Sequence, residues 1–369
     1  MLDEYLDEVK NFLKSQQGEA EVVVMPDFFI DRFVSINTSP NHFFKTVMKV
    51  VERKGGSIDG INQKEFRGGN AINTAAALAS LGVKVIPIVC TDKLGLQLIK
   101  FYVKSLKISL AHIKIVEEPS ITTALEFETS NGKANVMLRD VGSLADFGPQ
   151  NLDANDFEAI KRADCTCVFN WAGTRKFGTE LAETVFRYVK TQGKGKTYFD
   201  PADPNPNREG TRKLLERVLQ SDLVDVLSLN ENEAVFFASL MKGRTEKPEK
   251  GLGFEKLAME SAKFLASRLK ARIDLHTTEY SATFNGKNEK VVPAFHVPVL
   301  RVTGAGDAWT AGNILGTVYG LSDAVRLTLA NAVAAYYISN PEGKHPTRKE
   351  LFKLCDWLRG RWKTKTDKN

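Results

Sequence analysis

One short stretch of this chain combines permissive glycines with a carboxylic acid. Thr303-Gly304-Ala305-Gly306-Asp307 places two glycines before the acid, and small apolar residues follow from Ala308 onward. Glycines in a turn let successive backbone N–H groups converge on one point, and a helix that begins there adds the positive end of its dipole. The stretch is therefore typical of an anion cradle with a carboxylate at its mouth.

A carboxylate beside developing negative charge is repelled by it, unless its role is to take a proton. Asp307 therefore indicates a general base that activates a hydroxyl for attack on a phosphate held by the N–H groups. A structural alternative remains open at this point. In that alternative the glycines form only a turn, and Asp307 caps the helix that follows.

A second glycine pair lies far upstream. Gly68 and Gly69 precede an alanine-rich helical run from Ala71 to Leu81, and Asn70 and Asn73 share one side of that helix. The glycines allow a hinge and close approach of a ligand, while the two amides could hydrogen-bond a polyhydroxyl ligand. The alternative is a helix cap at Asn70 with close packing of the small residues.

Buried strands alternate with helices along most of the chain, which predicts a parallel sheet with helices on both faces. Several predicted strands run into polar residues where they end. These residues are Asp31, Asp92, Asp200, Asn230, Thr277 and Asp307. Because the carboxyl ends of parallel strands share one edge, we expect these side chains to gather there. Asp27 is as compatible with a loop cap as with a ligand contact.

Two segments interrupt the alternation. Residues 33–65 are too long for a plain connection, so we interpret them as an insertion that forms strands of a flap. Farther on, Thr122–Glu128 and Lys133–Leu138 flank Ser130-Asn131-Gly132, which is typical of an antiparallel hairpin. We expect the hairpin to lie over the site.

The composition is that of an ordinary globular protein, with 43% hydrophobic and 26% charged residues. The net charge is +6, but the basic tail lacks a repeat of basic and aromatic residues, so no nucleic-acid partner is expected. No apolar run reaches about 18 residues, so no membrane span is expected. The four cysteines form no C-x-x-C pair and indicate a reduced, cytoplasmic protein.

Two common catalytic motifs are missing. The chain has neither a G-x-S-x-G elbow nor a Walker A lysine motif. Any phosphate must therefore be held by backbone N–H groups and other side chains.

The order of the motifs resembles the ribokinase/PfkB family of carbohydrate kinases over roughly Val22 to Glu350. Gly68-Gly69-Asn70-Ala71-Ile72-Asn73-Thr74-Ala75 resembles the first family signature. Val302-Thr303-Gly304-Ala305-Gly306-Asp307-Ala308-Trp309 resembles the second, T-G-A-G-D. Asn230 and Glu233 match the family's N-x-x-E.

This resemblance implies a ribokinase-like α/β fold, with three α/β/α layers, a mostly parallel central sheet and a small antiparallel β lid. The kinase domain would span residues 21–360, with lid segments at about 33–66 and 111–139. An N-terminal helix extension (1–20) would precede it, and a basic tail (361–369) would follow. Lids of this family often pair between subunits, so a homodimer through the lid is expected.

The resemblance also implies a mechanism and the residues that carry it. Asp307 would take a proton from the substrate hydroxyl, and the N–H groups of Gly304, Ala305 and Gly306 would stabilise the transferring phosphoryl group. Glu233 would place Mg²⁺ through water. Substrate contacts are expected from Asp31, Gly68, Gly69, Asn70 and Asn73. Nucleotide contacts are expected from Asn230, Thr277, Thr303 and Gly343.

Two positions depart from the family pattern. Arg301 stands where an acid contributes to a monovalent-cation site in some members, so activation by a monovalent cation is not expected. The family's T-x-G-x-x-G is replaced by Thr277-Thr278-Glu279-Tyr280-Ser281-Ala282, which lacks the glycines and keeps ADP open as the donor in place of ATP.

We therefore expect a magnesium-dependent kinase that phosphorylates a hydroxyl of a sugar, sugar phosphate, cyclitol or nucleoside. ATP is the default phosphoryl donor, and an ADP-dependent sugar kinase is the first alternative. A catalytically silent sugar- or nucleotide-binding protein is the second, although binding alone needs no base such as Asp307. A vitamin-type kinase acting on an aromatic alcohol is disfavoured by the two-part lid.

Overall fold

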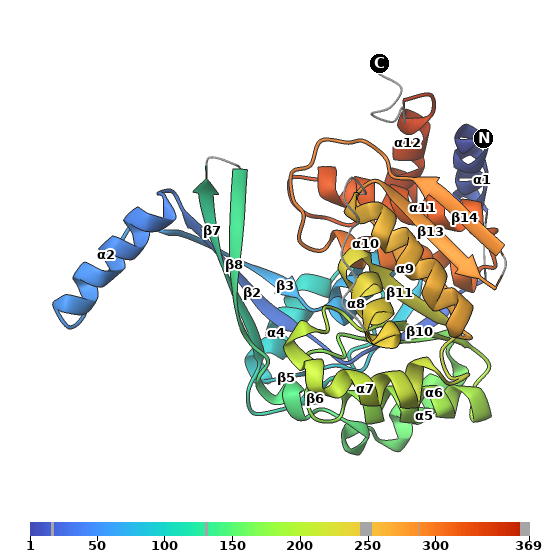
Figure 1. Cartoon of the computed structure of the whole chain (residues 1–369), viewed down its shortest axis with the longest axis horizontal. Helices are drawn as coiled ribbons and strands as arrows, with labels where there is room; N and C mark the ends of the chain where they lie inside the picture. Colours follow the sequence, from blue (N-terminus) through green and yellow to red (C-terminus); the bar gives the residue numbers. More distant parts are fainter. Residues whose placement is uncertain (16–17, 130–131, 244–252, 287, 362–369) are drawn as a thin grey trace.

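Eight strands form the central sheet in the computed structural model of the chain (Figure 1). Their order across the sheet is β14-β13-β12-β11-β10-β9-β1-β4. The strands are β1 (Glu21–Met25), β4 (Lys84–Pro87), β9 (Cys165–Phe169), β10 (Lys196–Asp200), β11 (Val226–Asn230), β12 (Arg272–His276), β13 (Tyr280–Asn285) and β14 (Asn288–Pro293). The pairings from β4 across to β12 are parallel, and β13 and β14 add an antiparallel edge. The structure describes residues 1–15, 18–129, 132–243, 253–286 and 288–361.

Burial on both faces explains why the strands are unbroken apolar runs. Val22 and Val24 of β1 belong to one buried apolar cluster, whereas Val23 and Met25 belong to another. Successive side chains of a strand point to opposite faces, so a run such as EVVVM needs helices on both sides. The predicted three-layer α/β/α arrangement is confirmed.

Each of the two clusters is completed by its own set of helices. The first set is α1 (Leu2–Lys14), α3 (Asn70–Ser80), α4 (Lys93–Val103), α10 (Ala305–Val318), α11 (Asp323–Ser339) and α12 (Arg348–Leu358). The second set is α5 (Ala154–Arg162), α6 (Gly178–Gln192), α7 (Thr211–Leu214), α8 (Glu231–Lys242) and α9 (Phe254–Arg268).

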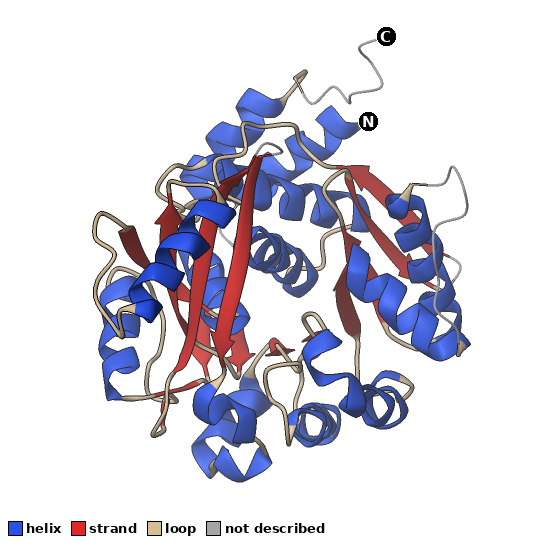
Figure 2. Cartoon of the chain, turned by 60° about the vertical axis from the view of Figure 1, so that its left-hand side comes forward, coloured by secondary structure: helices blue, strands red, loops and turns tan. Residues whose placement is uncertain are grey.

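A second sheet of four strands projects from the main body (Figures 1 and 2). This lid sheet has the order β3-β2-β7-β8 and consists of β2 (Phe29–Ile36), β3 (Asn62–Gly68), β7 (Ser120–Thr129) and β8 (Gly132–Asp140). Its outer pairings are antiparallel and its central β2–β7 pairing is parallel. The predicted hairpin is confirmed as β7 and β8, while Ser130 and Asn131 of its turn lie outside the described residues.

The segment 33–65 contains a helix, so the expectation of strands alone is wrong there. Helix α2 (Pro40–Glu52) separates β2 from β3 and extends away from the body (Figure 1). The side chain of Ser39 accepts a hydrogen bond from the His42 N–H, and Pro40 is the first helical residue. Both features favour a helix start, and they override the strand expectation locally.

The N-terminal helix follows its sequence pattern. Leu2, Leu6, Val9 and Leu13 of α1 are buried, and the helix packs against α11 and α12. All four cysteines are buried and free. Within the described ranges, no helix combines the length and the apolar character that crossing a membrane would require.

Candidate active site

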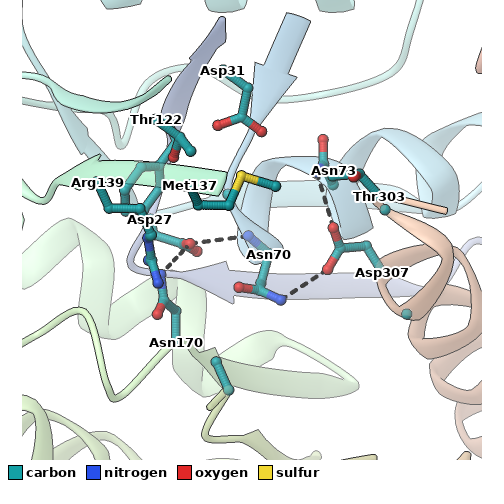
Figure 3. Close-up of a pocket in the computed structure, with 15 residues that line it drawn as sticks. Asp27, Asp31, Asn70, Asn73, Thr122, Met137, Arg139, Asn170, Thr303 and Asp307 are labelled. Carbon is teal, nitrogen blue, oxygen red and sulfur yellow. Dashed lines mark hydrogen bonds between the residues drawn. The ribbon is translucent and has the colours of Figure 1, made fainter. Parts of the chain in front are cut away.

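A cavity of about 360 Å³ lies where the lid sheet meets the carboxyl ends of β1 and β9 (Figure 3). The predicted site residues that line it are Asp31, Gly69, Asn70, Asn73, Thr303, Gly304, Gly306 and Asp307. Gly68 and Ala305 are immediate neighbours of these residues in the chain. The two glycine-containing segments, more than 230 residues apart in sequence, therefore form one site.

Asp307 lies in the first turn of α10 and is held by two amides. The Nδ2 atoms of Asn70 and Asn73 donate to its two carboxylate oxygens, each at 2.9 Å. The preceding Gly304 has a φ of 88°, a left-handed conformation that glycine adopts readily. Burial, together with the negative charges of Asp27 and Asp200, raises the pKa of Asp307 to about 8. This carboxyl group can therefore exchange a proton near neutral pH.

One predicted N–H donor of the anion cradle, that of Ala305, already makes a backbone hydrogen bond. The N–H of Ala305 donates to the carbonyl oxygen of Val302 at 3.1 Å, which closes the turn before α10. Gly304 and Gly306 line the cavity on either side of it. A phosphoryl group could use the Ala305 N–H only if this turn relaxed.

Asp27 caps α3 from the neighbouring strand end. Its carboxylate accepts hydrogen bonds from the backbone N–H groups of Asn70 (3.0 Å) and Ala71 (2.8 Å) and from Nδ2 of Asn170 (2.8 Å). Gly69 has a φ of 91°, and a Cβ atom there would lie 2.9 Å from the Cα of Phe28. The cap alternative for Asp27 is confirmed, although the capped helix lies 43 residues away in sequence.

Asp31 does not lie at a strand end, so that expectation is wrong. Met25 ends β1, and the chain re-enters a strand at Phe29, which places Asp31 within β2 of the lid sheet. A Cβ atom at Gly68 would overlap the Asp31 carboxylate. Burial raises the pKa of Asp31 to about 6, and the lid thus brings a second carboxyl group into the cavity.

Only some of the polar residues that were expected at one edge of the central sheet lie there. Asp200 and Asn230 end β10 and β11, and Thr277 follows β12. Asp92 instead follows β5 (Cys90–Thr91), which pairs with β6 (Lys114–Ile115) in a separate small sheet, and Asp307 belongs to a helix. The residues of the cavity therefore come from several kinds of element, and the hydrophobic pattern of single strands does not indicate this arrangement.

Asn230 and Glu233 form a capping box at the start of α8. The Glu233 carboxylate accepts from the backbone N–H (2.9 Å) and Nδ2 (2.8 Å) of Asn230. Burial, followed by the charge of Asp200, raises the pKa of Glu233 well above its usual range. Burial likewise raises the pKa of Asp200 to about 7. Carboxyl groups that repel one another in this way fit a nearby divalent cation, which would stabilise their ionised forms.

In the described part of the chain, no group of three or more His, Cys, Asp or Glu side chains is arranged to hold a metal ion directly. Thr277 closes a turn, because its Oγ1 accepts from the N–H groups of Glu279 and Tyr280. The first cavity is not lined by Asn230, Glu233, Thr277 or Gly343.

The residues around Arg301 do not fit a bound monovalent cation. The guanidinium lies against Gly343, where a Cβ atom would overlap it. It also lies over the rings of Phe66 (5.3 Å) and Tyr337 (5.1 Å). A fixed positive charge therefore occupies the position that the resemblance gives to a cation ligand.

Six further residues line the cavity that the motifs did not assign, and one of them, Ala202, follows β10. Asn170 directly follows the buried strand β9, so the strand-end rule could have found it. The lid sheet contributes Phe29, Thr122, Met137 and Arg139. No local signal identified these four, because their position depends on how the hairpin folds over the body.

The family model for pfkB family carbohydrate kinases matches residues 44–350. The chain belongs to this family. Its members are phosphotransferases, and the T-G-A-G-D segment with its partly buried acid agrees with that class.

Solved structures share the fold of this pfkB family chain. Ribokinase from Arabidopsis thaliana, complexed with ribose and ATP, is 21% identical with a TM-score of 0.67, covering 92% of this chain and 99% of that one. Ribokinase from Cryptococcus neoformans var. grubii serotype A, in complex with ADP, is 17% identical with a TM-score of 0.68 and the same coverage. Adenosine kinase from Sinorhizobium meliloti is 18% identical, with a TM-score of 0.67 and the same coverage.

The raised pKa of Asp307 predicts a pH-dependent cost to stability. An aspartate of the unfolded chain ionises near its ordinary pKa of 3.8, whereas the folded one does so near 8, so unfolding releases a proton between these values. The free energy of unfolding should therefore fall as pH rises from about 4 to 8, by up to about 1.4 kcal/mol per pH unit. In urea unfolding at pH 5 and 7.5, Asp307→Asn should remove the contribution of Asp307 and so reduce this slope, to which Asp31 and Asp200, whose pKa values are also raised, still contribute. The exposed Asp59→Asn should leave it unchanged, and parallel slopes for Asp307→Asn and wild type would contradict the prediction.

Proposed function

We propose that this chain is a magnesium-dependent kinase that transfers the terminal phosphoryl group of a nucleotide to a hydroxyl of a small polyhydroxyl substrate. The observation that carries the proposal is Asp307, a carboxyl group with a pKa of about 8 at the start of α10, directly after the Gly304 turn. A base is most effective when its pKa lies near the working pH. Asp307 can therefore accept a proton close to the helix N-terminus, where a phosphoryl group could bind.

In the proposed reaction, Asp307 takes the hydroxyl proton as the oxygen attacks the phosphoryl group. The amides of Asn70 and Asn73 fix the orientation of the carboxylate by holding both of its oxygens. The N-terminus of α10 offers positive potential for the charge on the phosphoryl oxygens. Closure of the lid sheet over the cavity would exclude water that could otherwise accept the phosphoryl group.

Mg²⁺ would neutralise charge on the nucleotide phosphates and orient them. The ion would lie near Asp200 and Glu233, the latter acting through water, where burial and mutual repulsion raise both pKa values. The donor is ATP by default, with ADP as the alternative. The proposed nucleotide contacts from Thr303, Asn230 and Thr277 stay predictions, as does the contact from Gly343, which lies in a different cavity.

The acceptor is proposed to carry an anionic group, such as the phosphate of a sugar phosphate. Arg139 of β8 lies over the Phe29 ring (5.1 Å), and its charge opposes the rise that burial causes in the pKa of Asp27 and of Asp31. Within the described ranges, no carboxylate oxygen lies within 4.0 Å of the Arg139 guanidinium, so Arg139 forms no ion pair there. This charge can therefore pair with the substrate while Asp31 accepts hydrogen bonds from hydroxyl groups.

Asp307→Asn should abolish turnover and leave nucleotide binding largely intact. Loss of a general base costs roughly 10²–10⁴-fold in kcat, while the cradle and the helix dipole remain. A coupled assay over sugars, sugar phosphates, nucleosides and aromatic alcohols, with ATP and with ADP, measures kcat, and calorimetry measures nucleotide affinity. Asp59→Asn is the control. Near-normal turnover of Asp307→Asn would refute the base, and transfer to no acceptor by the wild type would favour the silent binder.

Arg139→Met should raise KM for a phosphorylated acceptor by roughly tenfold, because one charge-assisted hydrogen bond contributes about 1.5–3 kcal/mol. The KM for the matching unphosphorylated acceptor should change little. Arg32→Met is the control, because Arg32 also lies on the lid sheet but is paired with Glu65. Equal effects on both acceptors would contradict a role for Arg139 in binding the anionic group.

We also propose a homodimer formed through the lid. No residue of α2 is buried, and Phe44, Met48 and Val51 on one side of the helix are 52%, 55% and 60% exposed. These side chains need a partner surface, and the helix projects from the body where a second copy could reach it (Figure 1).

Met48→Lys should convert the dimer to a monomer in light scattering after gel filtration, because a buried charge opposes association. Thr46→Lys introduces the same charge on the opposite side of α2 and should leave the dimer intact. A wild-type protein that is monomeric at all concentrations, or a dimer insensitive to Met48→Lys, would overturn this interface.

A further inference from the structure

We propose that a second cavity, lined by Arg67, Arg301 and His345, is a binding site for a phosphate-bearing small molecule. The cavity has a volume of about 650 Å³. Asn73 lines both this cavity and the first, so the start of α3 separates them. The proposed transfer reaction uses only Asn73 and Gly343 of its lining, so a ligand held by Arg67 and Arg301 is additional to that reaction.

Three of the basic side chains that line this cavity have a buried nitrogen atom without a hydrogen-bond partner. The Nε atoms of Arg67 and Arg301 are inaccessible to solvent and have no hydrogen-bond partner, and the same holds for Nδ1 of His345. Over the described ranges, no carboxylate oxygen lies within ion-pair distance, 4.0 Å, of either guanidinium. Burial lowers the pKa of Arg67, and the positive charge of Arg301 opposes its protonation as well.

A positive charge that is partly withdrawn from water without a partner is unfavourable, and a bound anion would offset that cost. The two acids that line the cavity are already engaged. Glu342 pairs with Lys344, and Glu350 accepts hydrogen bonds from Thr347 at the start of α12. The missing counter-charge must therefore come from a ligand.

The donor chemistry indicates phosphate. A guanidinium presents parallel N–H groups that match two oxygens of a phosphate, and two guanidiniums can bind one dianion. Phe66 and Tyr337 flank Arg301, and the ring of His345 stacks on Tyr337 with 4.7 Å between centroids. These aromatic walls limit the motion of Arg301 and leave its charge directed at the cavity.

The cavity is connected to the transfer site by short contacts. Tyr337 Oη donates to the carbonyl oxygen of Thr303 at 3.1 Å, and Asn73 donates to Asp307. Arg67 directly precedes Gly68 and Gly69. A ligand that draws Arg67 and Arg301 together would therefore shift the backbone next to both glycine-containing segments of the first cavity.

The test is direct binding of inorganic phosphate to the full chain, measured by calorimetry and by the shift in Tm at constant ionic strength. The wild type should bind phosphate and gain in Tm. Arg67→Met combined with Arg301→Met should lose at least tenfold in affinity, whereas Arg32→Met and Asp307→Asn should keep it. Sulfate should compete with phosphate, and chloride should not.

Two outcomes would overturn the proposal: no binding by the wild type at millimolar phosphate, or unchanged affinity of the double variant. Binding that is lost in Asp307→Asn instead would assign the phosphate to the transfer site.

A second measurement needs no variant. Phenylglyoxal modifies arginine side chains, and mass spectrometry locates the modified residues in the wild-type protein. Phosphate should protect Arg67 and Arg301 from modification and should leave Arg32 unprotected. Equal modification of all three residues with and without phosphate would contradict the site.

Discussion

The start of α3 binds two carboxylates at once, and the rest of the site depends on this arrangement. Asp27 takes the backbone N–H groups of Asn70 and Ala71, and Asp307 takes the side-chain amides of Asn70 and Asn73. The helix N-terminus thus joins the end of β1 to the start of α10. Its positive potential also favours having two acids close together, which would otherwise repel one another.

The lid sheet follows from the same constraint. Asp27 and Gly69 lie against one another, so β2 begins beside the end of β3, and the two strands pair antiparallel from Phe29 opposite Gly68. Asp31 then faces the cavity only because residue 68 has no side chain to displace it. One local contact between two backbone segments therefore sets both the position of the lid and the carboxyl group that it carries.

Sequence patterns predicted those features that a local rule controls. The alternation of strands and helices, the β7–β8 hairpin and the turn before Asp307 each depend on residues close together in the chain. The role of Asp27 and the position of Arg139 depend on contacts between distant segments, and neither hydrophobic periodicity nor motif spacing predicts such contacts. Helix α2 carried a local signal in Ser39-Pro40, and the expectation of strands alone was wrong because β2 and β3 occupy only the two ends of segment 33–65.

Charge is distributed unequally on the two sides of α3. The acids in and beside the first cavity have pKa values raised to about 6, 7 and 8 in Asp31, Asp200 and Asp307, so Asp307 above all keeps a proton near neutral pH that a cation or a basic substrate group could displace. The second cavity holds guanidiniums without counter-ions. The first cavity therefore favours a positively charged ligand and the second a negatively charged one. Either ligand, when bound, would stabilise the fold. Asn73 lines both cavities and therefore lies between these two charge environments.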